Sequence, residues 1–236
     1  MIKQKIILVF TFTIILTSLH AQNEVNTYDE NGKRHGIWQK TYPGSDQLRY
    51  KGRFNHGKEI DTFKYYKLKR KKSVLSAIKV FDSNSHKAEV TFMASNGKVV
   101  SKGAMDGKKF IGKWLYYHKN SDTIMIEEIY DVDGQLTGQR KVYFGNGNIA
   151  ETSNYKQGKL DGISKNYDEA SKLLQESMYE NGKLNGQTSY YDTKGSIKAK
   201  GSFKDNTKVG VWEYYSKGIL SKKVDHDIDK IIYQKE

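Results

Sequence analysis

The sequence predicts an all-β protein: an elongated single-layer antiparallel sheet of about eight tandem β-hairpin repeats, twisted or curled. Three observations predict it. A glycine, an aromatic residue two positions later and a tyrosine five positions later recur every 24 to 27 residues. Six units also contain an aliphatic residue that is followed six positions later by an aromatic one, and Val99 and Met105 occupy these positions in a weaker copy. Clusters of Gly, Asn, Asp and Lys separate these stretches, as turns separate strands.

The repeat is anchored by a column of glycines, which we interpret as structural residues. Its members are Gly36, Gly112, Gly138, Gly162, Gly186 and Gly210, with Asp61 and Ala88 at the two other anchor positions. The column two positions later includes Trp38, Phe63, Trp114 and Trp212. The column five positions later holds Tyr66, Tyr117, Tyr143, Tyr167, Tyr191 and Tyr215.

Each unit holds two short runs rich in Tyr, Trp, Phe, Ile and Val, which predicts one hairpin per unit. A single hairpin is not stable alone in water, so neighbouring hairpins must stack into one sheet. The stretch from Asp168 to Tyr179 has a helix-like composition. Because it aligns with the other repeats, we predict a turn followed by a strand there.

Side chains alternate between the two faces of a strand, so the second and fifth positions after the anchor face opposite ways. Aromatic residues therefore lie on both faces, and we expect at least one face to form an exposed surface that stacks against partners or sugars. The candidate binding residues are Trp38, Tyr66, Trp114, Tyr117, Tyr143, Tyr191, Trp212 and Tyr215.

A second candidate contact is the densest run of positive charge in the chain. It consists of Lys67, Lys69, Arg70, Lys71 and Lys72 and is predicted at the tip of the second hairpin. Such a cluster favours an anionic surface. The alternative is a flexible, solvated loop.

Several segments resemble MORN repeats (membrane occupation and recognition nexus): GKRHGIWQKTY, GKKFIGKWLYY, GKLDGISKNY, GKLNGQTSYY and KVGVWEYY. They are most similar to the bacterial variant family that is often labelled an antitoxin component. The resemblance covers nearly all of residues 28–224 and implies a hairpin-repeat fold. Asp61 and Ala88 depart from the glycine of the motif, and the segment from Lys67 to Ser73 adds residues to the second unit.

The chain divides into three parts. Residues 1–21 are predicted to be a signal peptide, because Lys3 and Lys5 precede a short apolar run and a small-residue cleavage region. An uncleaved anchor is the alternative, although the apolar run is too short to span a bilayer. Residues 22–224 form the predicted repeat array. Residues 225–236 are predicted to be a solvated C-terminal tail, whose Asp225–Asp229 cluster has the alternative of weak cation binding.

The formal net charge is +13, and removal of the signal segment leaves 38 of the 40 basic residues against 27 acidic ones, or +11. This excess favours an anionic polysaccharide or lipid headgroups, whereas the export signal argues against nucleic acid. The alternative is that the lysines protect strands and turns from aggregation. Unpaired sheet edges also permit end-to-end self-association.

The sequence contains no cysteine, so disulfides, thiolate metal ligands and cysteine nucleophiles are excluded. No His pair has the spacing of a zinc site, and no Gly-rich phosphate loop, G-x-S-x-G motif or catalytic triad is present. We therefore predict no metal, no cofactor and no enzymatic activity.

The leading hypothesis is a non-enzymatic, exported repeat scaffold of the cell envelope, which binds a protein or an anionic polymer through a basic, Tyr/Trp-rich face. Export places the protein in the periplasm, at the cell surface or outside the cell. One alternative, implied by the resemblance, is an antitoxin-like or immunity-like partner that neutralises a toxin. A second alternative is a polysaccharide-acting enzyme with a site in a groove of the curved sheet.

Overall fold

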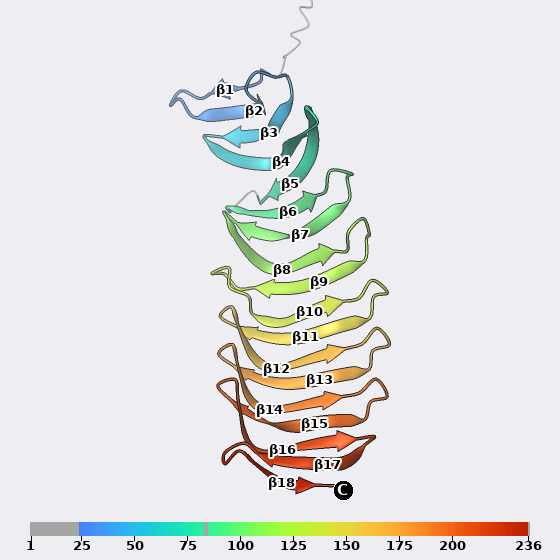
Figure 1. Ribbon diagram of the computed structural model, residues 1–236. Coiled ribbons are helices and arrows are strands. Elements are labelled where there is room, and N and C mark those ends of the chain that lie inside the picture. Colours follow the sequence, from blue (N-terminus) through green and yellow to red (C-terminus); the bar gives the residue numbers. More distant parts are fainter. Residues whose placement is uncertain (1–23, 83–84, 236) are drawn as a thin grey trace, which may run out of the picture.

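The computed structural model describes residues 24–82 and 85–235 (Figure 1). These residues form 18 strands in one open sheet, and they contain no helix. Within the described ranges, no helix is long and apolar enough to cross a membrane. The strands are β1 (Thr27–Tyr28), β2 (Arg34–Thr41), β3 (Leu48–Asn55), β4 (Lys58–Lys69), β5 (Lys72–Phe81), β6 (Lys87–Met93), β7 (Val99–Asp106), β8 (Lys109–Tyr117), β9 (Ile124–Tyr130), β10 (Gly138–Tyr143), β11 (Ile149–Lys156), β12 (Lys159–Tyr167), β13 (Leu173–Glu180), β14 (Lys183–Tyr191), β15 (Ile197–Lys204), β16 (Thr207–Ser216), β17 (Ile219–Asp225) and β18 (Lys230–Gln234).

Every strand pairs antiparallel with its neighbours in the sequence, from β1 at one end to β18 at the other. The predicted all-β array of hairpins is therefore confirmed. The stretch with helix-like composition is also a strand, β13, and it follows a turn as predicted. Its register with the neighbouring repeats thus outweighs its local composition.

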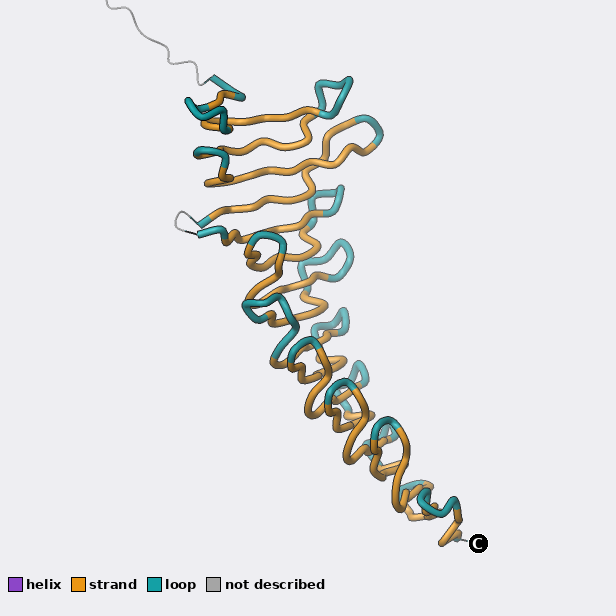
Figure 2. The backbone as a smooth tube through the Cα atoms, turned by 90° about the vertical axis from the view of Figure 1, so that its left-hand side faces the viewer, coloured by secondary structure: helices purple, strands orange, loops and turns teal. Residues whose placement is uncertain are grey.

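The sheet twists along its length. In Figure 2, the strands near β1 lie across the view, whereas those near β18 are seen almost end-on. Strands in a sheet rotate relative to one another in a constant sense, so a long stack of hairpins accumulates this rotation. The predicted twist is visible in this view.

A bulge recurs at anchor positions along the array, although the pairing of β5 with β6 at Ala88 shows no register shift. Gly162 and Gly186 have φ values of 104° and 111°, a region that residues with a side chain rarely adopt. The pairing register shifts beside them, between Ser153 and Tyr155 and between Ser177 and Tyr179. The four other anchor glycines also have positive φ.

Asp61 replaces the anchor glycine in the second unit, with φ at 57°. This value lies in the left-handed region that Asp tolerates. The substitution therefore preserves the bulge, and the register of β3 and β4 shifts there as it does beside Gly162 and Gly186. The departure from the motif at this position leaves the local fold unchanged.

The hydrophobic core lies on one face of the sheet and consists of ring clusters. One cluster contains Trp38, Phe54 and Phe63, and the next is built around Val90, Met105 and Trp114. Phe81 packs against both clusters, so that they are continuous along this face. A single layer can bury these rings because side chains from successive strands cover one another.

The structure corrects the predicted C-terminal tail. Residues 225–236 contain β18, which pairs with β17, and the acidic cluster forms the turn between the two strands. The Asp227 carboxylate accepts a hydrogen bond from the Gly210 backbone N–H at 2.8 Å. This segment lacks the glycine and aromatic signals of the repeat, so its sequence gave no sign that it extends the ladder. The predicted signal peptide, residues 1–21, lies outside the described residues.

Candidate binding surface

The tryptophans lie in the core. The exposed fraction of the side chains is 9% for Trp38 and 0% for Trp114 and Trp212. Each indole N–H donates a hydrogen bond to a backbone carbonyl, as from Trp114 to Ala104 at 2.9 Å. The prediction that these three residues help to form an exposed binding platform is therefore wrong, because they are buried and satisfied. We call their side of the sheet the tryptophan face.

The tryptophan face changes character in the middle of the array. Small polar residues there replace the large rings, and four of them are buried: Ser153, Ser164, Ser177 and Thr188. Beside them, Arg140 forms ion pairs with Glu128 at 3.1 Å and Glu151 at 3.2 Å. The Ser153 hydroxyl also hydrogen-bonds with the Glu151 carboxylate at 2.7 Å. Polar pairing thus replaces ring packing in this segment.

The opposite side carries the tyrosine column, and we call it the tyrosine face. Its tyrosines are half-buried: Tyr66, Tyr117, Tyr143, Tyr167, Tyr191 and Tyr215. The Tyr214 ring lies beside that of Trp212, with their centroids 6.3 Å apart, whereas the adjacent Tyr215 donates a hydrogen bond to Glu213 on the other face. Tyr167 belongs to the same column, although we did not include it among the candidate binding residues. The binding role of the column remains a prediction.

A ladder of charged residues runs beside the tyrosines. Cross-strand pairing places seven lysines and three glutamates in one column: Lys51, Lys64, Lys102, Glu127, Lys141, Lys165, Glu176, Lys200, Glu213 and Lys223. Residues that pair directly across strands share a face. Ion pairs link part of this ladder, as between Lys165 and Glu176 at 2.9 Å. Lysines outnumber glutamates, so the tyrosine face is basic.

The strongest coupling within this ladder surrounds Glu213. Lys223 lies 2.8 Å and Lys200 3.0 Å from its carboxylate, and Tyr215 donates a third contact at 2.6 Å. Hydrogen bonds from Lys223, Tyr215 and Lys200 lower the pKa of Glu213 from 4.5 to about 2. The same contact to Glu213, followed by burial, raises the pKa of Tyr215. Both groups therefore keep their charge states at neutral pH.

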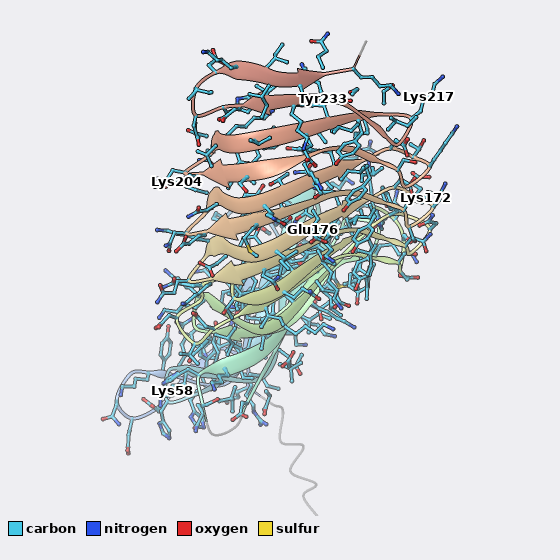
Figure 3. All side chains as sticks on the ribbon, turned by 90° about the horizontal axis from the view of Figure 1, so that it is seen from below. Lys58, Lys172, Glu176, Lys204, Lys217 and Tyr233 are labelled. Carbon is cyan, nitrogen blue, oxygen red and sulfur yellow. The ribbon has the colours of Figure 1, made fainter. Side chains whose placement is uncertain are left out.

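The turns form two rows, one at each end of the strands, which we call the turn edges of the sheet. Lysines line both turn edges. Figure 3 shows Lys58 and Lys204 at one edge, Lys172 and Lys217 at the other, and Glu176 on the strands between them. The densest group lies at the tip of the β4–β5 hairpin, as its position in the repeat predicted. Arg70 and Lys71 form the turn there with positive φ values, so the segment is a tight turn rather than a long loop.

The dense group consists of the predicted contact residues Lys67, Lys69, Arg70, Lys71 and Lys72, all of them exposed. Lys69 donates a hydrogen bond to Ser95 in the next turn along the same edge. The group is thus presented to solvent, and its contact with an anionic surface stays a prediction.

Many titratable groups of the described residues pair with one another across strands. Among the described residues, no group of three or more His, Asp or Glu side chains could hold a metal ion. The Arg140 cluster is an internally paired network, and its carboxylates accept hydrogen bonds from protein side chains. The surface carries half-exposed rings, ammonium groups and turn amides, which are groups that suit non-covalent recognition.

The sequence reasoning missed three glycines that accommodate the rings of the core. Gly52, Gly103 and Gly201 lie directly beneath Phe63, Trp114 and Trp212. A signal for them was present, because each stands nine residues before an anchor position. The same position holds Ser153 and Ser177 in the units where serine or threonine replaces the ring.

These features define a class: an open, single-layer repeat protein whose hairpins bury one face and leave a basic face half-exposed. The family model described as MORN repeat variant matches residues 136–157 and 160–181. The two adjacent units are therefore MORN repeats of the variant type, and the resemblance deduced from the motifs is confirmed there. The match carries no indication of an antitoxin role. No curated protein matches the chain.

Proposed function

We propose that this protein is an exported, non-enzymatic scaffold that holds an anionic polymer of the cell envelope along its tyrosine face. The observation that carries the proposal is the parallel arrangement of the tyrosine column and the lysine-rich ladder on one face. Half-exposed tyrosines supply apolar surface with a polar tip, and the lysines supply attraction for negative charge. The repeats extend this combination over many strands, which suits a long ligand.

Export is supported by the charged start and short apolar run of residues 1–21. Expression of the full chain in a bacterial host with a secretory pathway, followed by cell fractionation and mass spectrometry, tests it. We expect a mature form that begins near Gln22 outside the cytoplasm. A full-length, cytoplasmic product would contradict this part of the proposal.

Affinity capture from cell-envelope extracts tests the binding. The mature protein is compared with two triple variants at Tyr143, Tyr167 and Tyr191, one to Leu and one to Phe. We expect the unaltered protein and the Phe variant to retain an anionic polymer, identified by sugar and charge analysis, and the Leu variant to retain much less. Equal capture by all three would contradict a role for the rings, and thermal melting verifies that each variant is folded.

The same captured polymer tests the absence of catalysis. After long incubation with the protein, its chain length should be unchanged. A shortened polymer, with turnover abolished by one point substitution, would identify an enzyme and overturn the proposal.

A further inference from the structure

A groove crosses three successive hairpins at one turn edge of the sheet. A hollow of about 530 Å³ is lined by residues of the β6–β7 and β8–β9 turns, by Tyr117 and by Lys69. A smaller hollow of about 200 Å³ adjoins it, since Lys69 and Ser95 line both. The β4–β5, β6–β7 and β8–β9 turns all lie at the same turn edge of the sheet (Figure 1).

The groove is strongly basic. Lys69, Lys98 and Lys119 line the larger hollow and Lys67 the smaller, whereas neither hollow has an Asp or Glu in its described lining. Lys98 is paired with the exposed Asp122 at 2.9 Å. Lys119 makes no ion pair within the described part of the chain. Ammonium groups without a carboxylate partner attract an anion.

The rest of the lining is apolar or amide-bearing. Val99, Val100 and Met125 form part of the wall, together with the half-buried ring of Tyr117. The Asn96 side-chain amide donates a hydrogen bond to the Asn120 side chain at 2.7 Å, which fixes these two turns relative to each other. Lys102 lies 5.8 Å from the centre of the Tyr117 ring and adds a further cation nearby.

We propose that this groove binds a carboxylated sugar unit of a linear acidic polysaccharide, with Lys69 and Lys119 contacting carboxylates and the Tyr117 ring packing against a sugar face. This inference rests on the proposed function and gives it a location and a ligand class. A bare inorganic anion would use the ammonium groups but leave the ring and the aliphatic wall without a partner. A sugar acid uses both kinds of surface.

The repeat geometry favours a chain rather than a single small ion. Neighbouring strands lie about 4.8 Å apart, so turns on one edge recur roughly every 10 Å. The lysines of the groove come from three successive hairpins and are therefore spread along the turn edge. A polymer that carries a carboxylate on each of its sugars engages several of them at once, which raises its affinity above that of one unit.

Isothermal titration with tetragalacturonate as the probe tests the inference. The double variant Lys69→Ala/Lys119→Ala is compared with Lys194→Ala/Lys217→Ala, which removes two lysines from turns at the same edge outside the groove. We expect the groove variant to bind about tenfold more weakly than the unaltered protein, because two charge-assisted contacts are lost. The control should stay within about twofold, as only long-range charge changes.

Two further comparisons separate the sugar from the charge. Tyr117→Leu should weaken binding, whereas Tyr117→Phe should preserve it. The methyl ester of tetragalacturonate should bind weakly, and tripolyphosphate should bind less tightly than the sugar acid. Equal loss in both lysine doubles, or equal affinity for tripolyphosphate, would overturn the inference.

The test also distinguishes this inference from the proposed function. If the unaltered protein binds envelope polymer but the groove variant binds it just as well, the location is wrong and the scaffold function stands. If the unaltered protein binds neither tetragalacturonate nor any anionic polymer from the envelope, the proposed function itself fails.

Discussion

Trp114 packs so closely over Gly103 that a Cβ atom added to the glycine would lie 2.6 Å from the indole ring. The same relationship holds for Trp212 over Gly201 and Phe63 over Gly52. Each ring fills the space above a glycine of the adjacent strand, and each is fully buried. The aromatic core therefore depends on residues without side chains as much as on the rings themselves.

Gly103→Ala should destabilise the protein by about 1–3 kcal/mol, because the new methyl group forces the Trp114 ring out of its position. Gly145→Ala is the matched control. Its Cβ would meet no atom within 4 Å, and its φ is not positive. Urea unfolding followed by tryptophan fluorescence measures both. Equal stability of the two variants would show that the ring does not depend on this glycine.

Arg140→Met should lower the free energy of unfolding by about 1–3 kcal/mol, because it leaves the carboxylates of Glu128 and Glu151 without their cation. The side chains of Arg140 and Glu128 are only 20% and 13% exposed, so water compensates poorly. Lys183→Met is the control, since its ion pair with Asp205 is well exposed and should matter little. A loss as large in the control as in Arg140→Met would rule out a special role for this network.

The lowered pKa of Glu213 predicts a loss of stability in acid. A carboxylate whose pKa is lower in the folded state stabilises the fold above its unfolded pKa, and this contribution is lost as the pH falls through the folded value. For Glu213 the window runs from 4.5 down to about 2. Over this range, the unfolding free energy of Glu213→Gln should fall less than that of the unaltered protein.

Urea unfolding at a series of pH values measures this difference. Glu169→Gln, at an exposed turn residue, serves as the control. Identical pH dependence of Glu213→Gln and the unaltered protein would show that the three contacts to Glu213 do not stabilise the fold.

Strand β18 is the outer strand of the described sheet, and the exposed fractions of its Ile231 and Ile232 are 58% and 50%. We propose that the unpaired side of β18 mediates end-to-end self-association, because an exposed apolar edge strand pairs readily with another strand. Sedimentation velocity over a range of concentrations should show association that the double variant Ile231→Lys/Ile232→Lys reduces. Ile219→Lys changes an equally exposed isoleucine on β17 and should leave it intact. A monomer at every concentration would contradict this proposal.

The repeat spacing predicted the strands and their order well, because hydrophobic periodicity and turn residues are local signals. The burial of Trp38, Trp114 and Trp212 was harder to foresee, since aromatic columns occur on both faces. The pairing of a ring with a glycine or serine nine positions before the anchor would have identified the core face. β18 was not predicted because antiparallel pairing with β17, and not the repeat motif, places it.

The groove around Lys69 also could not be predicted from the sequence. Its lining comes from three hairpins, and their approach depends on how separate hairpins stack. The lysine run itself was visible as a charge cluster. The sequence did not show that Tyr117 and Lys119 lie beside this lysine run.

Chemical footprinting of tyrosines with tetranitromethane, read by mass spectrometry, tests most directly which face of the sheet binds the polymer. The protein is modified with and without its captured polymer. Tyr155 and Tyr179 lie two residues after the buried Ser153 and Ser177 on β11 and β13, and therefore on the tryptophan face. We predict that bound polymer protects Tyr117, Tyr143, Tyr167 and Tyr191 on the tyrosine face, and leaves the reactivity of Tyr155 and Tyr179 unchanged. Protection of Tyr155 and Tyr179 instead, or no protection on the tyrosine face, would contradict it.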